Sequence, residues 1–160
     1  MADMLVKLYP LPADPDLEPD LAEQGVVIKQ ALAPDRSKVI AFAQECGYPN
    51  FADEVRAAFA NMPVTCFIAV KDRRIVGFAC CEATARGFFG PTAVMESERR
   101  KGIGKALLLR CLSAMREMGY AYAIIGWPAE NALHFYQNAC GAIMIPDEGH
   151  GVYSRMVDID

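Results

Sequence analysis

The sequence has few of the residues that build metal centres. Only two histidines, His134 and His150, occur among 160 residues, and the six scattered cysteines form no Cys-x-x-Cys pair. Structural zinc sites usually combine closely spaced Cys and His ligands. We therefore expect no metal site. We expect the cysteines, each of which stands in an apolar stretch, to be reduced residues of the core.

The chain also lacks a long apolar run and a surplus of positive charge. No stretch approaches the ~18 apolar residues of a membrane-spanning helix, and residues 1–11 are too short and polar for a secretory signal. Sixteen Lys and Arg residues against twenty Asp and Glu residues give a net charge of −4, whereas general nucleic-acid binders carry excess positive charge. We expect a cytoplasmic protein that binds neither membranes nor nucleic acid.

The composition fits one globular domain, since hydrophobic residues make up 53% of the chain. We expect residues 1–25 to form an edge strand and an acidic, proline-rich loop, and residues 26–160 to form the main domain. The late part reads as helix, strand and helix over residues 102–118, 122–127 and 130–140, and we expect closing strands at 142–145 and 152–157. Together with earlier β-rich runs, these elements predict an α/β domain with a mixed sheet. Pro91 lies inside one run and predicts an edge, a bulge or an opening in the strand pairing.

The most informative segment is a charged turn between a strand and the long helix. Residues 94–107 read VMESERRKGIGKAL. A helix that follows a strand so closely directs unpaired N–H groups and its positive dipole end at one point. Gly102 and Gly104 remove side chains that would block close approach. Basic side chains add positive charge there: Arg99, Arg100, Lys101 and Lys105. The turn is therefore a candidate cradle for a phosphate or diphosphate.

Two other phosphate-binding loops fit this turn poorly. A Walker A loop needs Gly at position 99 and Ser or Thr at position 106, where Arg99 and Ala106 stand. A dinucleotide-binding loop needs a third small residue where Leu107 stands, and it follows the first strand of its sheet.

The pattern of Val94, four residues and then Arg99-x-x-Gly102-x-Gly104 resembles the signature of the GNAT superfamily of N-acetyltransferases. The resemblance covers about residues 26–157 and includes Phe135-Tyr136 ahead of Gly141-Ala142. It implies a single-domain α/β (α+β) fold, with a mixed, largely antiparallel, twisted sheet of about 6–7 strands and about four helices.

The resemblance also implies an enzyme that transfers an acetyl or other acyl group from acyl-CoA to an amine by direct attack in a ternary complex. The co-substrate would be acetyl-CoA, without a metal, and the acceptor would be a small-molecule or peptide amine. The diphosphate would lie on the backbone of residues 99–104, and the pantetheine would run along residues 93–95 between splayed strands. The implied cofactor-binding residues are Ala93, Val94, Met95, Arg99, Arg100, Lys101, Gly102, Ile103, Gly104, Lys105 and Asn131.

Tyr136 matches the tyrosine with which many family members protonate the departing thiolate. A phenol of pKa ~10 stays protonated where a thiol of pKa ~8.5 begins to ionise. Periodicity alone instead makes Tyr136 a core aromatic. Glu82 and Glu96 are candidate general bases, although Glu82 could pair with Arg86 and Glu96 could be a solvated residue of the charged turn.

Several alternatives remain open at this point. Asn131 either contacts pantetheine or caps the following helix. The protein is either an enzyme or a non-catalytic acyl-CoA-binding sensor of the same fold, and an unrelated anion-binding domain is a third hypothesis. The acidic segments at 14–20 and 147–148 are candidates to attract a cationic amine, or they are solvated loops. An edge strand or an apolar face at 51–62 is a candidate surface for a homodimer.

Overall fold

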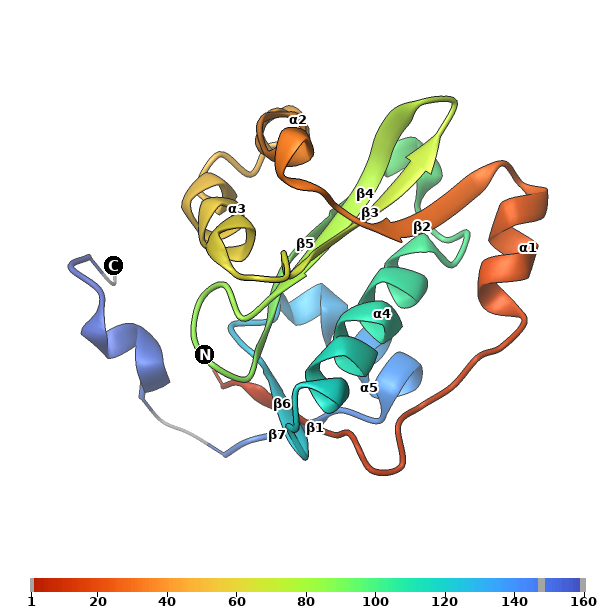
Figure 1. Ribbon diagram of the computed structural model, residues 1–160. Coiled ribbons are helices and arrows are strands. Elements are labelled where there is room, and N and C mark those ends of the chain that lie inside the picture. The colour runs from red at the N-terminus through yellow and green to blue at the C-terminus, as the bar shows by residue number, and fades with distance from the viewer. Residues whose placement is uncertain (1, 147–148, 159–160) are drawn as a thin grey trace.

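The computed structural model describes residues 2–146 and 149–158, which form one twisted sheet flanked by helices (Figure 1). The strands are β1 (Met4–Lys7), β2 (Val26–Gln30), β3 (Cys66–Lys71), β4 (Arg74–Cys81), β5 (Phe88–Val94), β6 (Tyr122–Ile125) and β7 (Ile143–Met144). The α-helices are α1 (Leu17–Glu23), α2 (Arg36–Glu45), α3 (Phe51–Ala60), α4 (Ile103–Glu117) and α5 (Leu133–Cys140). Short 3-10 helices are η1 (Ala33–Asp35), η2 (Glu96–Glu98), η3 (Glu130–Ala132) and η4 (Gly151–Arg155).

The seven strands lie in the order β2-β3-β4-β5-β6-β1-β7. Only β5 and β6 run parallel, and the other neighbours pair antiparallel. The crossover between the two parallel strands is α4, as a parallel connection requires. The structure thus confirms the predicted mixed, largely antiparallel sheet, with five α-helices in the described residues rather than about four.

The helices cover both faces of the sheet and divide the core in two. One core joins α1, α4 and α5 to the sheet, and Leu107, Leu108 and Leu112 of α4 are wholly buried in it. The other core packs α2 and α3 against the opposite face, around Phe42 and Phe78. Burying each such side chain contributes roughly 1.5–3 kcal/mol relative to exposure, so both cores stabilise the sheet.

The parallel pair β5 and β6 separates after a very short ladder. Phe88 pairs with Ile124 and Phe89 with Ile125, and no further pair joins the two strands. On the other edge of β5, the register with β4 shifts between Ala79 and Cys81, opposite the Gly90-Pro91 step. The prediction from Pro91 is confirmed, because strand pairing opens where this proline stands.

The N-terminal segment is more structured than its composition predicts. β1 lies inside the sheet, between β6 and β7, so the expected edge strand is wrong. The acidic stretch expected to be a loop contains α1, because Leu21 is fully buried against the sheet while the acidic side chains face outward. The proline at position 19 falls in the first turn of that helix, where no intrahelical N–H bond is lost. The domain boundary at residue 25 stays a prediction.

The C-terminal segment also differs from the expectation. Residues 152–157 are not a strand, because η4 forms there and buries Tyr153 against Trp127. The acidic pair at 147–148 lies outside the described residues. The apolar face of residues 51–62 is largely buried against the sheet, although Met62 is exposed. The homodimer stays a prediction.

All six cysteines are free thiols, and five of them are buried, as expected for reduced core residues. Within residues 2–146 and 149–158, no group of three His, Cys, Asp or Glu side chains is arranged to hold a metal ion. No helix in this described part has the length and apolarity needed to span a membrane.

Candidate active site

A cleft of about 880 Å³ lies where β5 and β6 separate. Its walls are the freed edge of β5 at residues 90–94 and the end of β6 at residues 125–129. The N-terminus of α4, the start of α5, α3 and η4 supply the remaining lining. This volume falls in the range of small-molecule and cofactor sites.

The turn that enters α4 forms one end of the cleft. Gly102 is the helix N-cap residue, with a φ of +95°, and no side chain caps this N-terminus. A Cβ at Gly102 would stand 2.8 Å from Leu17 Cδ1. At Gly104 a Cβ would contact Phe135 at 3.6 Å and Val94 at 3.8 Å, inside the cleft. A side chain at position 104 would therefore enter the cleft, whereas position 102 needs glycine because its positive φ and its contact with Leu17 disfavour any L residue.

Three basic residues of the turn line the cleft, namely Arg99, Arg100 and Lys105. Arg99 Nε donates to the Val94 carbonyl oxygen at 3.1 Å, so its guanidinium lies against the open edge of β5. Lys105 Nζ lies 2.7 Å from Asp14 Oδ2, which partly neutralises it. This end of the cleft is the more positive one.

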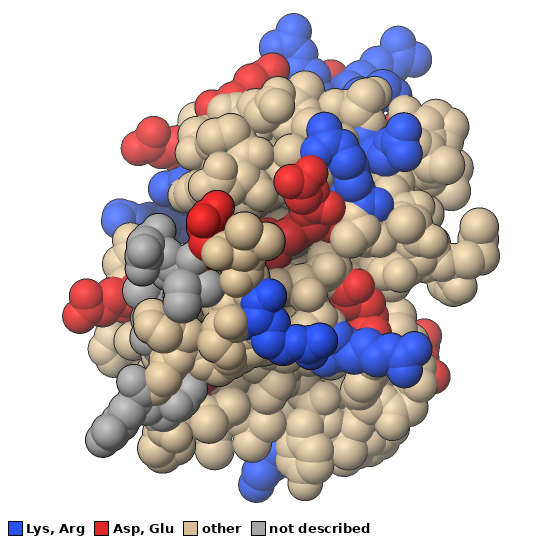
Figure 2. All heavy atoms as spheres, turned by 90° about the vertical axis from the view of Figure 1, so that its left-hand side faces the viewer, with Lys and Arg blue, Asp and Glu red and all other residues tan. Residues whose placement is uncertain are grey.

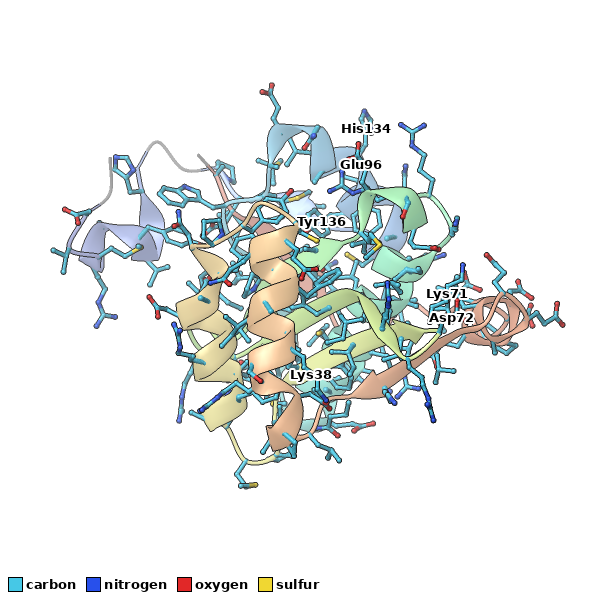
Figure 3. All side chains as sticks on the ribbon, turned by 90° about the horizontal axis from the view of Figure 1, so that it is seen from above. Lys38, Lys71, Asp72, Glu96, His134 and Tyr136 are labelled. Atoms are coloured by element: carbon cyan, nitrogen blue, oxygen red, sulfur yellow. The ribbon has the colours of Figure 1, made fainter. Side chains whose placement is uncertain are left out.

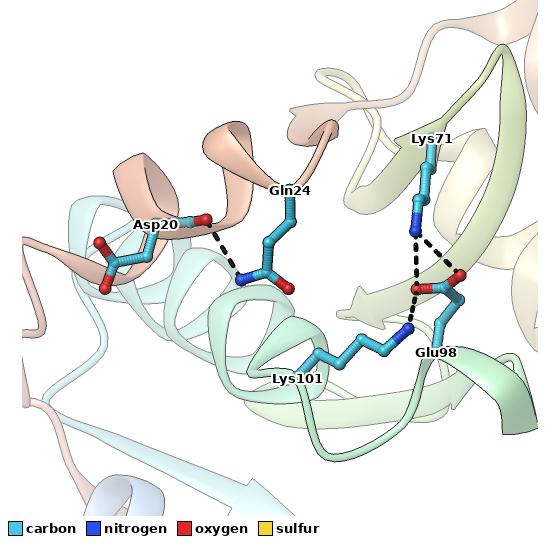
Figure 4. A network of polar contacts seen from close by, with 5 residues as sticks. All are labelled: Asp20, Gln24, Lys71, Glu98 and Lys101. Carbon is cyan, nitrogen blue, oxygen red and sulfur yellow. Dashed lines mark hydrogen bonds and ion pairs between the residues drawn. The ribbon is translucent and has the colours of Figure 1, made fainter.

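Three predicted cofactor-binding residues do not line the cleft: Met95, Lys101 and Ile103. Ile103 is buried in the core beneath the turn. Lys101 instead pairs with Glu98 at 2.9 Å, and Glu98 also accepts from Lys71 at 3.2 Å (Figure 4). These two hydrogen bonds lower the pKa of the Glu98 carboxyl. Through Lys71, the network connects the turn to the C-terminal end of β3.

Tyr136 lies in the cleft wall and is only 7% exposed. Its ring packs edge-on against Phe89 at 6.1 Å and against Phe135 at 5.0 Å between centroids. Burial, with a smaller contribution from Cys140, raises the pKa of Tyr136 to about 12. A phenol with this pKa is a proton donor across the physiological range. The structure therefore makes Tyr136 a core aromatic that also lines the cleft, and its role as the acid stays a prediction.

The two predicted general bases lie outside the cleft lining. Glu82 accepts hydrogen bonds from the Gly87 backbone N–H at 2.6 Å and from the Tyr120 hydroxyl at 2.9 Å. These hydrogen bonds stabilise the connection between β4 and β5. Glu96 is exposed, and Figure 3 shows it at the periphery, whereas Tyr136 lies within the body of the molecule. The assignment of either glutamate as general base stays a prediction.

Glu54 of α3 is the carboxylate that does line the cleft, and the sequence analysis missed it. It accepts a short hydrogen bond from the Thr84 hydroxyl. Burial raises the pKa of Glu54, and this hydrogen bond offsets part of the increase. The signal in the sequence is its place on the apolar face of α3, three residues after Phe51 and four before Ala58.

Two stacked aromatic pairs line the same part of the cleft as Glu54. Tyr48 and Phe51 stack at 4.9 Å between centroids with a 10° tilt. Trp127 and Tyr153 stack at 4.3 Å with a 5° tilt. Gly126 makes the second pair possible, because a Cβ there would collide with the Tyr153 hydroxyl.

Asn131 lies at the rim of the cleft, in η3. The N-cap residue of α5 is Ala132, and no side chain caps that helix. The alternative in which Asn131 caps the helix is therefore wrong, and its amide is free to face the cleft.

Solved acetyltransferase structures share this fold. The glucosamine N-acetyltransferase region of a fungal multi-domain beta-N-acetylglucosaminidase matches with a TM-score of 0.72 and 11% identity over 90% of this chain and 19% of that one. A GCN5-related N-acetyltransferase from Sphaerobacter thermophilus matches with a TM-score of 0.69 and 18% identity over 90% and 48% of the two chains. One from Kribbella flavida matches at 0.61 and 19% over 89% and 53%. This chain thus spans 19–53% of the length of these three relatives.

The fold is therefore that of an acetyltransferase domain, as the turn motif predicts. The sequence profile of the acetyltransferase (GNAT) family matches residues 28–142, well over half of the chain, and the protein belongs to this family. The match includes the α4 turn and Tyr136 but not β1 or η4. No curated protein sequence matches significantly.

Proposed function

We propose that this protein is an N-acetyltransferase that moves an acetyl group from acetyl-CoA to an amine bound in the same cleft. One observation carries the proposal. A single cleft contains an unpaired strand edge, an uncapped helix N-terminus and a buried tyrosine.

The residues present fit the cofactor. The turn before α4 offers N–H groups and basic side chains to a diphosphate, and its two glycines leave the space that a Cβ would fill. The edge of β5 at residues 90–94 offers unpaired backbone groups to an extended chain of amides, in the manner of an added strand. Asn131, which lines the same cleft, would contact that chain. Ile103 stabilises the turn by its burial in the core, and Lys101 does so by its ion pair with Glu98.

Acetyl-CoA supplies the acyl group as a thioester. Tyr136 would donate a hydrogen bond to the departing sulfur, because its pKa of about 12 keeps the phenol protonated while the thiolate forms. The amine nitrogen forms the new bond to the acyl carbon, and the carbon–sulfur bond breaks. The proton that the amine loses passes to solvent, and the CoA thiolate takes up a proton through the Tyr136 hydroxyl or from solvent. A small-molecule or peptide amine would be the acceptor.

The test is release of the CoA thiol from acetyl-CoA over a panel of polyamines, aminoglycosides, amino acids and peptide N-termini. The panel includes aminoglycosides because an aminoglycoside acetyltransferase from a soil metagenome has the same fold, with a TM-score of 0.54 at 19% identity. We expect saturable binding of CoA by calorimetry and steady thiol release with at least one acceptor. No binding of CoA would overturn the proposal.

A second candidate is an acyl-CoA-binding module without turnover. It is favoured by one observation, namely that neither Glu82 nor Glu96 lines the cleft. Both candidates predict binding of CoA, and only the enzyme releases thiol with an acceptor. Binding without thiol release across the whole panel would favour the module.

A further inference from the structure

The two ends of the cleft differ in charge. The basic residues among the described lining come from the turn before α4 and from the first turn of that helix: Arg99, Arg100 and Lys105. At the other end stands Glu54, on α3. Figure 2 views the side of the molecule that carries α3 and η4, where acidic side chains gather between basic side chains above and below. A cleft that is positive at one end and negative at the other favours two ligand groups of opposite charge.

Glu54 has no positive partner in the described part of the chain. None of the ion pairs there involves it, and its acceptor bond comes from the neutral Thr84 hydroxyl. The titratable groups that interact with Glu54 are also acidic or neutral. Burial is the main cause of the raised pKa of the Tyr153 phenol, and the negative charges of Asp3 and Glu54 raise it further. Glu54 likewise adds to the raised pKa of Cys80, behind burial and the neighbouring thiols. A half-buried carboxylate without a counter-ion is costly, and such groups mark binding sites more often than structural ones.

The aromatic pairs supply the second half of the site. Faces of Trp, Tyr and Phe attract cations, most strongly where water is excluded. The Tyr48–Phe51 pair comes from the α2–α3 junction and α3, and the Trp127–Tyr153 pair comes from the end of β6 and η4. Both pairs line the cleft together with Glu54. Flat apolar walls beside a single carboxylate suit an organic ammonium ion with an apolar skeleton.

We propose that Glu54, with the Tyr48–Phe51 and Trp127–Tyr153 pairs, forms the acceptor site, and that it selects primary ammonium compounds with an apolar or aromatic skeleton and no carboxylate. The inference rests on the proposed function and adds the acceptor class. An α-amino acid is disfavoured, because the basic residues of the described lining are the ones that the diphosphate would occupy, and none of them is then left to receive its carboxylate.

The experiment uses the one tryptophan of the chain, Trp127, as its reporter, with saturating CoA in place of acetyl-CoA so that the diphosphate site is filled and no acyl group can be transferred. Its fluorescence is titrated with three probes of one skeleton: 2-phenylethylamine, the neutral 2-phenylethanol, and L-phenylalanine, which adds a carboxylate. We expect the amine to bind about 10-fold or more tightly than either of the other two, since a charge-assisted hydrogen bond is lost or opposed in each. Equal affinities for the amine and the alcohol, or for the amine and phenylalanine, would overturn the inference.

The matched variants are Glu54→Gln and Asp53→Asn. Each removes one negative charge from neighbouring positions of α3, but the Asp53 side chain is 93% exposed. We expect Glu54→Gln to weaken binding of 2-phenylethylamine by about 10- to 100-fold and to leave 2-phenylethanol unchanged. Asp53→Asn should change neither. If Glu54→Gln bound the amine as wild type does, the inference would be wrong.

Calorimetry with CoA separates this inference from the proposed function. Glu54→Gln should bind CoA as tightly as wild type, which also shows that it folds. If wild type binds CoA and no saturable response to 2-phenylethylamine appears, the acceptor site is refuted and the transferase proposal stands. The comparison of probes on wild type needs no variant, so a misfolded Glu54→Gln would leave the test intact.

Discussion

Leu17 Cδ1 of α1 stands 2.8 Å from the point where a Cβ on Gly102 would lie. The N-terminal helix is therefore packed directly on the turn that enters α4. Two ion pairs reinforce this contact, from Asp14 to Lys105 and from Glu18 to Arg110. The segment ahead of the family match thus contacts the end of the cleft that carries its basic residues.

Gly102→Ala tests this contact. The variant must place a side chain at a φ of +95° and against Leu17, so we expect a loss of stability of at least about 1–2 kcal/mol. We also expect weaker CoA binding by calorimetry. Gly119→Ala is the matched control, because Gly119 has a φ of +101° and nothing within 4 Å of its virtual Cβ. It should lose similar stability and keep CoA affinity. A Gly102→Ala protein with unchanged CoA affinity would contradict the proposed turn.

Asp14→Asn should strengthen CoA binding. The substitution frees Lys105 from its carboxylate partner, and a partly exposed pair contributes at most about 1 kcal/mol, or roughly 5-fold in affinity. The gain should shrink as salt is added. Glu18→Gln is the control, since it breaks the Arg110 pair on the same helix face without touching a cleft residue. Equal effects of the two variants would show that Lys105 does not contact the diphosphate.

Tyr136→Phe keeps the packing and removes the hydroxyl. We expect the maximal rate of thiol release to fall by about 10²-fold or more, with CoA affinity retained. Tyr120→Phe, which removes a hydroxyl that donates to Glu82, should leave the rate almost unchanged. Because the pKa of Tyr136 is about 12, the wild-type rate should show no loss from this group at pH 9. A Tyr136→Phe enzyme of full activity would exclude the acid role.

The acceptor should bind less well at acid pH. The raised pKa of Glu54 means that its carboxyl protonates at a higher pH than an ordinary glutamate. The protonated carboxyl has no negative charge with which to attract an ammonium ion. The groups facing it are the Thr84 hydroxyl, the Tyr153 phenol and the Cys80 thiol, which all stay neutral over this range. Acceptor KM, measured in wild type and Glu54→Gln, should rise with acid only in wild type.

The same substitution should alter stability in a pH-dependent way. A carboxyl whose folded-state pKa is raised favours folding below its unfolded pKa, and that advantage is lost as pH rises through the folded pKa. Glu54→Gln should therefore be more stable than wild type at neutral pH, and the difference should vanish in acid. Thermal unfolding at several pH values measures this. A variant less stable than wild type at pH 7 would show that Glu54 has a structural role.

The α4 turn could be predicted from the sequence because its parts are contiguous. A strand, a charged stretch with Gly102 and Gly104, and an amphipathic helix fix the direction of the free N–H groups without help from the rest of the chain. Pro91 also predicted an edge, a bulge or an opening in the pairing, since proline cannot donate a ladder hydrogen bond, but the sequence did not decide among the three.

Only the tertiary structure brought together the cleft residues that we propose as the acceptor site. Glu54, Trp127 and Tyr153 come from segments far apart in the chain, and no local period links them. β1 pairs with β6 across more than a hundred residues, and η4 forms because Tyr153 buries its ring on Trp127. Such contacts are stabilised by burial against partners far away in the chain, and the spacing of residues along the sequence does not predict them.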